Sequence, residues 1–159
     1  MFEIIGGIVI FSVLVLLSGV KTVKEHDRMV VFRAGKILGS RGPGMHLIVP
    51  FLERGHLVDA RPATYSIEPV EAVTSDNCHL KVTGLLVAQV VEAARAISKI
   101  SDYQKSTVDT AQAVIAEAIR RHTASEVVDE RKRLNHRIKS ELEKRAKPWG
   151  VRIRSLEIK

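Results

Sequence analysis

Hydrophobic and polar positions divide the chain into three consecutive parts. Residues 4–20 form an unbroken apolar run without a charged side chain. Between residues 29 and 90, short β-branched and apolar segments are separated by turns that contain glycine and proline, a pattern typical of antiparallel strands. After Glu92, apolar residues recur every three or four positions, which predicts helices. This order of elements favours an α+β fold.

The N-terminal run is long enough to cross most of a bilayer. As a helix, residues 4–20 would cover roughly 25 Å. A cleaved signal peptide is the alternative, but only Glu3 carries a charge ahead of the run, and Leu16 and Leu17 occupy positions where cleavage needs small residues. A buried core helix is a second alternative, but the run has no polar face for water. We therefore predict an uncleaved membrane anchor over residues 1–23 and a folded domain over residues 24–159. The anchor side chains are Ile4, Ile5, Ile8, Val9, Ile10, Phe11, Val13, Leu14, Val15, Leu16, Leu17 and Val20.

The flanking charges predict the orientation of this single-pass anchor. Its C-terminal side carries Lys21, Lys24, Arg28, Arg33 and Lys36. Because cytoplasmic flanks are enriched in Lys and Arg, we expect the rest of the chain to be cytoplasmic, at a plasma or inner membrane.

Five strands are expected in the middle part, at residues 29–33, 45–49, 55–60, 65–74 and 80–90. The GKILGSRGPG segment carries enough glycine for tight turns. Pro69 lies within the fourth predicted strand, and since proline cannot donate to a ladder, this strand should lie at a sheet edge.

Two helices and a last strand should follow. The spacing of Val108, Ala111, Ile115, Ala118 and His122 predicts a helix over about 102–122. A second helix should reach about Lys147, opened either by a Thr123 and Glu126 capping box or by Ser125 as a simple N-cap. Its apolar seam is Leu134, Ile138 and Leu142. After Pro148 the chain alternates again, with a change of phase at Ser155.

Composition limits the function classes. With 159 residues, the expectation is one folded domain that can bury a core of ordinary size. The net charge of +7 and pI of about 9.8 favour anionic partners, but only 4% of residues are aromatic, which leaves few platforms for stacking bases. A single cysteine, Cys78, excludes an internal disulfide.

No pattern indicates catalysis or a metal site. The six histidines have no metal-binding spacing, GKILGS lacks the ending of a phosphate-binding loop, and no serine lies in a G-x-S-x-G turn. We interpret Cys78 as a structural thiol. We expect no enzyme, no cofactor and no metal.

The second predicted helix is strongly basic. The segment from Asp129 to Arg154 contains ten Lys or Arg residues and four acidic residues. One reading is a solvated helix face, helped by a Glu141–Arg145 pair; a second is a surface for anionic lipid or a neighbouring subunit; nucleic acid is a third. The candidate residues are Arg131, Lys132, Arg133, Arg137, Lys139, Lys144 and Arg145.

Several motifs resemble the stomatin, or SPFH/band 7, family. Its opening, E-x-x-R-x-V-x-F-R-x-G followed by G-P-G and an apolar run ending in proline, is similar to VKEHDRMVVFRAGKILGSRGPGMHLIVPF at residues 23–51. Its V-D-x-R segment, helix pair and last strand are similar to VDARPATYSI, AQAVIAEAIRRHTASEVVDER and WGVRIRSLEIK. The resemblance covers residues 23–159 in order, and the chain looks more like the prokaryotic members.

The resemblance implies a strongly curved antiparallel sheet packed with helices, following a membrane anchor. It implies an oligomeric, non-enzymatic scaffold that gathers in lipid microdomains and modulates channels, transporters or membrane proteases. In prokaryotic relatives a frequent partner is an NfeD-type membrane protein. The other function class left open is a membrane-tethered module that binds an anionic ligand or nucleic acid through the basic helix.

Two departures change these expectations. Family members continue from E-I-K into a long Ala- and Glu-rich coiled-coil helix that assembles rings, whereas this sequence ends at Lys159. We therefore expect either a truncated form or fragment, or weak assembly through the folded domain. The anchor has no proline, which favours a straight span over a membrane hairpin.

The run MHLIVPFL does not alternate as a half-buried strand would. It is either covered on both faces by the helices of the domain, or it dips into the headgroups, where the resembled family places its corresponding loop. In the second case basic residues at its ends would lie among anionic lipids. The predicted membrane-interface loop comprises Arg41, Met45, Leu47, Ile48, Val49, Pro50, Phe51, Leu52 and Arg54.

Overall fold

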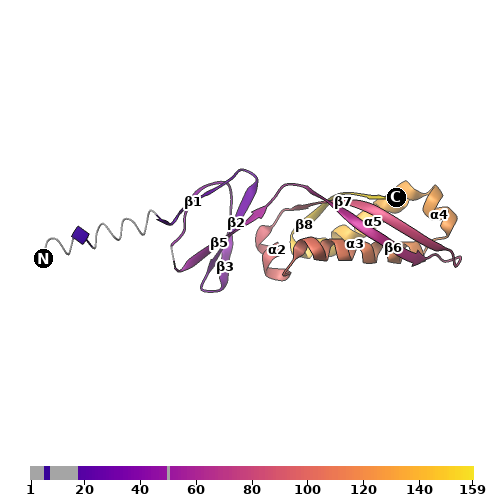
Figure 1. Cartoon of the computed structure of the whole chain (residues 1–159), viewed down its shortest axis with the longest axis horizontal. Helices are drawn as coiled ribbons and strands as arrows, with labels where there is room; N and C mark the ends of the chain where they lie inside the picture. Colours follow the sequence, from indigo (N-terminus) through magenta and orange to yellow (C-terminus); the bar gives the residue numbers. More distant parts are fainter. Residues whose placement is uncertain (1–5, 8–17, 50) are drawn as a thin grey trace. The chain divides into compact units, whose positions relative to one another are not determined.

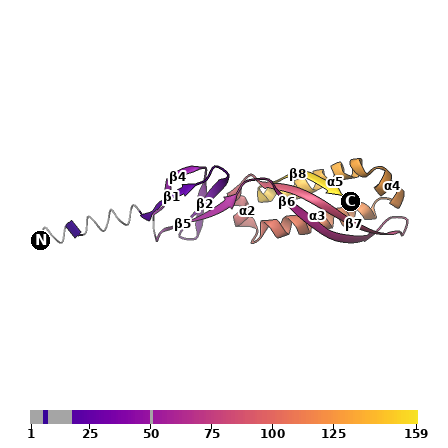
Figure 2. The same cartoon turned by 45° about the horizontal axis from the view of Figure 1, so that its top comes forward.

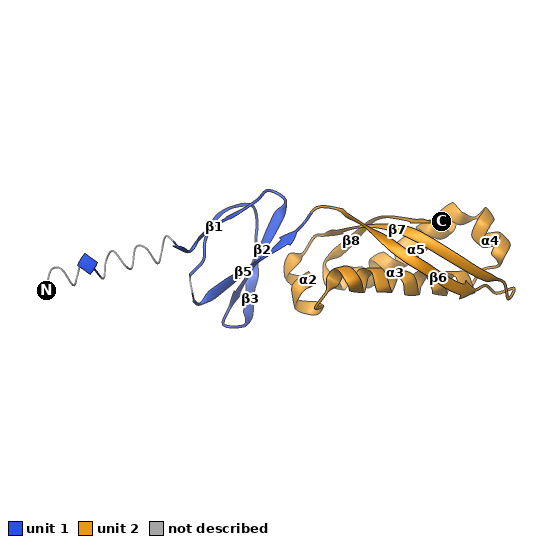
Figure 3. Cartoon of the chain, viewed as in Figure 1, with its two compact units in different colours: residues 1–60 blue, residues 61–159 orange. Residues whose placement is uncertain are grey.

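The computed structural model describes residues 6–7, 18–49 and 51–159 of the chain. It divides the chain into two compact units, residues 1–60 and 61–159 (Figure 3). Val23, Met29, Val31 and Ile48 form a core in the first unit, and a larger cluster fills the second.

Most of the predicted anchor falls outside the described residues, which leave out residues 1–5 and 8–17. Within the part of the chain that is described, no helix is both long and apolar enough to cross a bilayer. Val20, predicted to end the anchor, is instead the first residue of strand β1 (Val20–Val23).

The first unit consists of two small antiparallel sheets (Figure 1). Strand β1 pairs with β4 (Gly44–Leu47). In the other sheet, β2 (Asp27–Arg33) lies between β3 (Lys36–Arg41) and β5 (Glu53–Asp59). The segment predicted to form turns contains strand β3. The two-residue loop before it, Ala34 and Gly35, has φ angles of 47° and 79°, as a tight hairpin turn requires.

The second unit is a three-stranded antiparallel sheet covered by helices. Its strands are β6 (Ala63–Val73), β7 (His79–Val90) and β8 (Val151–Ile158), in the order β6-β7-β8. Its helices are α2 (Ala93–Lys99), α3 (Tyr103–Arg120), α4 (Ala124–Asp129), α5 (Arg131–Ala146) and the short 3-10 helix η1 (Lys147–Trp149). Helix α3 packs against β6, α5 packs against β8, and the two helices contact each other (Figure 2).

Both edge strands of this sheet are irregular. Strand β6 lies at an edge, as Pro69 predicted, and its register with β7 shifts between Ile67 and Val70. Strand β8 lies at the other edge, and its register with β7 shifts between Val87 and Ala88, opposite Ser155 and Ile153. This bulge explains the change of phase in the sequence, because it lets Ile153 and Leu156 both point into the core.

The helical part agrees with the prediction except at one break. The capping box of Thr123 and Glu126 is present, and Leu134, Ile138 and Leu142 are buried. The second predicted helix, however, is divided into α4 and α5 at Glu130, whose φ and ψ are −98° and 23°. The sequence has neither proline nor glycine at this position, so the break has no local signal.

Candidate membrane-facing and charged surfaces

An exposed group of large apolar side chains lies on β4 and in the segment that joins β4 to β5. Phe51 is 99% exposed and Met45 77%, whereas Ile48 is only 4% exposed. The run is therefore not covered on both faces, and the structure places Ile48 in the core of the first unit instead of in a membrane-interface loop. Pro50 lies outside the described residues. We call the exposed set the apolar loop: Met45, Leu47, Val49, Phe51 and Leu52.

Hydrogen bonds hold this loop from both ends. On its N-terminal side, the Ile48 amide donates to the Gly19 carbonyl oxygen at 2.8 Å. On its C-terminal side, the Glu53 amide donates to the Val49 carbonyl oxygen at 3.0 Å, and the Val49 amide donates to the Glu53 carboxylate at 3.1 Å. Phe51 has a φ of 71°, an uncommon left-handed conformation for a bulky residue. Hydrogen bonds thus hold the two ends of the apolar loop, and the aromatic side chain of Phe51 is exposed to solvent.

The Glu53 carboxylate is the centre of this arrangement. Its side chain is 2% exposed and forms an ion pair with the Arg33 guanidinium. The hydrogen bond from the Val49 amide lowers the pKa of Glu53 below its ordinary value; burial opposes this effect, and Arg33 adds to it. A buried carboxylate without such partners would be costly, so Arg33 and Val49 together keep it ionised.

Two basic side chains, Arg41 and Arg54, lie beside the apolar loop. Arg41 donates to the Leu47 carbonyl oxygen at 3.1 Å, and this contact ties the guanidinium to the loop. Arg54 is exposed and lines a pocket together with Phe32, Phe51 and Leu52. Exposed apolar patches of this kind mark sites of interaction with a protein or a membrane.

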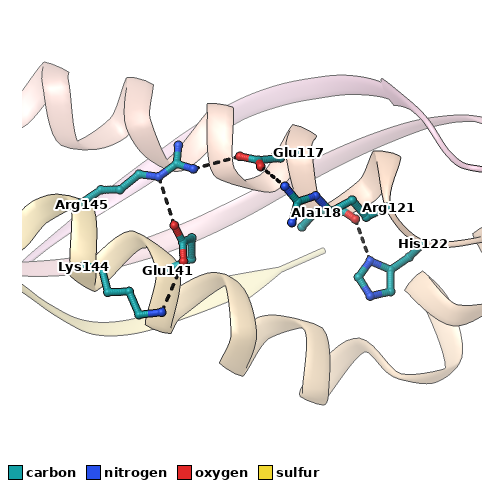
Figure 4. A network of polar contacts seen from close by, with 7 residues as sticks. All are labelled: Glu117, Ala118, Arg121, His122, Glu141, Lys144 and Arg145. Atoms are coloured by element: carbon teal, nitrogen blue, oxygen red, sulfur yellow. Dashed lines mark hydrogen bonds and ion pairs between the residues drawn. The ribbon is translucent and has the colours of Figure 1, made fainter.

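The basic helix α5 has two different sides. On the side that faces α3, Arg145 contacts both Glu117 (2.9 Å) and Glu141 (3.4 Å), and Lys144 contacts Glu141 at 3.6 Å (Figure 4). Arg133 pairs with Glu130 in the same way. The predicted Glu141–Arg145 pair is therefore confirmed, and it belongs to a network that also includes Arg121 of the α3 C-cap. Exposed ion pairs of this kind add little stability.

His122 joins the same two helices at their other end. Its Nδ1 lies 2.8 Å from the Ala118 carbonyl oxygen (Figure 4), and its Nε2 lies 3.4 Å from Arg137 Nη1. Since the guanidinium can only donate, this geometry fits an imidazole with its proton on Nδ1. Arg137 thus reaches from α5 to His122, just beyond the end of α3.

Three further cations of α5 differ from these paired ones. Arg131, Lys132 and Lys139 have no ion-pair partner within residues 6–7, 18–49 and 51–159. Relative to Glu141, the 100° rotation per residue places Lys139 and Lys132 about 160° and 180° around the helix. They therefore lie on the side of α5 away from α3.

The described residues contain no group of three or more side chains that could hold a metal ion. Cys78 is exposed in the turn between β6 and β7, close to Asp76. The pKa of Asp76 is lowered, first by the Thr74 hydroxyl and further by the Ala124 amide, while burial opposes both. The polar groups of this turn are thus engaged in joining the hairpin to α4.

Comparisons with known proteins match nearly the whole chain to one family. The SPFH domain / Band 7 family matches residues 21–159. An uncharacterized protein of Archaeoglobus fulgidus is 39% identical over 96% of this chain and 61% of its own length. A stomatin homologue of Pyrococcus horikoshii is 30% identical over 99% of this chain and 59% of its own length. Mouse stomatin is 31% identical over 88% and 50%.

This chain thus spans between one half and about three fifths of the length of these three relatives. The match extends over both compact units, so the small sheets that carry the apolar loop and the helix-covered sheet are parts of one family domain. On these grounds the chain belongs to the SPFH domain / Band 7 family.

Proposed function

We propose that this chain is a non-enzymatic, membrane-associated scaffold of the stomatin type. Residues 4–20 anchor it as a single helix, and the folded part lies on the cytoplasmic side, where copies assemble, gather in lipid microdomains and modulate integral membrane proteins. An anionic bilayer, other copies of the chain and a membrane protein of the NfeD type are the proposed partners. Support comes from the family, from the apolar run and from its basic C-terminal flank.

The observation that carries the membrane contact is the apolar loop. Its five large apolar side chains are exposed on a hydrogen-bonded support, and Arg41 and Arg54 lie beside it. Fully burying one such side chain contributes about 1.5–3 kcal/mol, and each cation near an anionic surface adds about 1 kcal/mol. Insertion of this loop into the headgroup layer would thus give the protein a second contact beyond its anchor.

A depth measurement on the full chain tests this contact. In a Trp149→Phe background, Phe51→Trp places the sole tryptophan at the tip of the apolar loop. We expect its fluorescence to be quenched when the protein is reconstituted into anionic vesicles that contain brominated lipids, and its emission to shift to shorter wavelength.

The matched control is Val128→Trp in the same background, because Val128 is also an exposed apolar residue, at 69% exposure, but lies on α4 of the second unit. Its emission should not respond to brominated lipids. Equal quenching of the two tryptophans, or none at either position, would contradict a specific contact through the apolar loop.

A further inference from the structure

Charge is distributed unequally across the second unit. Strand β6 and helix α3 with its cap Asp102 carry five carboxylates and two cations. The segment from α5 to β8 carries ten cations and three carboxylates. Because β6 and β8 are the opposite edges of the sheet, and α3 and α5 pack on β6 and β8 respectively, the two charges accumulate on opposite flanks.

The negative flank is a recess between β6 and α3. Its lining includes Glu68 of β6 together with Asp102 and Asp109 of the α3 region, and the cation Lys105 lies among them. Glu68 and Asp109 are exposed and have no ion-pair partner in the part of the chain that the structure describes. We call this surface the acidic flank.

The positive flank is the outer side of α5. Lys132 and Lys139 lie there, turned away from α3, and carry charges that no carboxylate of the described chain neutralises. On the inner side, by contrast, Arg145 and Lys144 are paired with Glu117 and Glu141. We call the surface of Lys132 and Lys139 the basic flank. Long, flexible lysines suit a recess lined by carboxylates, since an ammonium group can reach several oxygens.

We propose that the basic flank of one copy docks into the acidic flank of the next copy, head to tail. The two surfaces are different and lie on opposite sides of one unit, so the contact is heterologous and leaves both outer flanks of a pair free for further copies. Such contacts build rings or open rows. The irregular edges of β6 and β8 disfavour a continuous ladder between copies, which leaves side-chain charge as the specific element.

This inference deepens the proposed scaffold and rests on it only in requiring that copies assemble. The test is a charge exchange in the full chain, extracted in detergent at about 0.1 M NaCl, with the protein mass measured by light scattering after subtraction of the detergent. The acidic-flank variant is Glu68→Lys with Asp109→Lys, and the basic-flank variant is Lys132→Glu with Lys139→Glu.

We expect the wild type to assemble and each variant alone to fall to the 17.6 kDa of a single copy. In the first variant both flanks are basic, and in the second both are acidic, so an equimolar mixture should regain the mass of the wild type. The control exchanges two exposed lysines that belong to neither flank, Lys24→Glu with Lys99→Glu, and should assemble like the wild type.

Wild-type mass in either flank variant would overturn the inference, as would a mixture that stays dissociated. If a variant does not fold, as judged by its thermal melt, the salt dependence of the wild type tests the proposal. Raising NaCl to about 0.5 M should lower the wild-type mass, because charge contacts are screened over a few Å at high salt, and an unchanged mass would refute the proposal.

A monomeric wild type that binds anionic vesicles through Lys132 and Lys139 would assign the basic flank to lipid instead. The tryptophan measurement on the apolar loop is independent of all these outcomes, so a failure of assembly is distinguishable from a failure of membrane contact.

Discussion

Val49 and Glu53 are joined by two hydrogen bonds of opposite direction. The Glu53 amide donates to the Val49 carbonyl oxygen, and the Val49 amide donates to the Glu53 carboxylate. Arg33, twenty residues earlier on β2, supplies the charge that accompanies the buried carboxylate. On its C-terminal side, the exposed apolar loop is therefore joined to the sheet through one ionised side chain, and the geometry of this side of the loop should depend on pH.

The first prediction concerns Glu53→Gln. The folded pKa of Glu53 lies below its ordinary value of 4.5, so the unfolded chain binds more protons in acid. Its contribution to stability is present above that ordinary value and lost as the pH falls through the folded pKa. Urea unfolding should show Glu53→Gln less stable than wild type at pH 7, with the difference shrinking as the pH falls below about 4.5.

The control for this measurement is Glu25→Gln, at an exposed position of the same unit. The pKa values of Asp76 and Glu126 are also lowered. Both residues are present in wild type and in Glu53→Gln, so their pH-dependent contributions to stability cancel in the difference between the two proteins. A Glu53→Gln deficit that stays the same from pH 7 to pH 3 would refute the role of the ionised carboxylate.

The second prediction separates two neighbouring residues of the loop. Leu47 is exposed and Ile48 is in the core. Leu47→Asp should therefore leave the thermal melt of the full chain nearly unchanged, and in the Phe51→Trp protein it should reduce quenching of the introduced tryptophan by brominated lipids. Ile48→Asp should destabilise the first unit, because an aspartate buried without a partner is costly. Equal melting temperatures for the two variants would argue against an exposed Leu47 side chain next to a buried Ile48 side chain.

The third prediction concerns the cap of α4. Thr123 accepts a hydrogen bond from the Glu126 amide, and the Glu126 side chain accepts one from the Thr123 amide. Thr123→Ala should lower the free energy of unfolding by about 1 kcal/mol, whereas Thr123→Ser should be nearly neutral because its hydroxyl can still accept the bond. Chemical denaturation of the two variants side by side measures this, and an equal loss in both would show that the methyl group matters more than the cap.

The fourth prediction concerns the seam of α5. Leu142 is completely buried in the core of the second unit. Leu142→Ala should lower the free energy of unfolding by about 2–5 kcal/mol, since both apolar burial and packing are lost. Val128→Ala, at an exposed apolar position, should change it by less than about 0.5 kcal/mol. Similar losses at the two positions would mean that α5 is not packed as described.

Elements whose signals are local could be predicted from the sequence alone. Periodicity located α3 and the seam of α5, the pattern of Thr123 and Glu126 located a helix start, and Pro69 and Ser155 marked the irregular edge strands, because caps, prolines and side-chain periods act within a few residues. The family, too, could be identified from motifs in the sequence. Tertiary structure decided the rest.

Val20 was predicted to belong to the anchor, but it pairs with Leu47 in the sheet of β1 and β4. Ile48 lies in the core, whereas its neighbours Leu47 and Val49 are exposed. Glu53 contacts Arg33, which is twenty residues away in the chain. The acidic and basic flanks are likewise built from segments that are far apart in the chain. No local pattern encodes them, since they depend on which strands and helices pack side by side, and it is these nonlocal arrangements that give the apolar loop and the charged flanks their proposed roles.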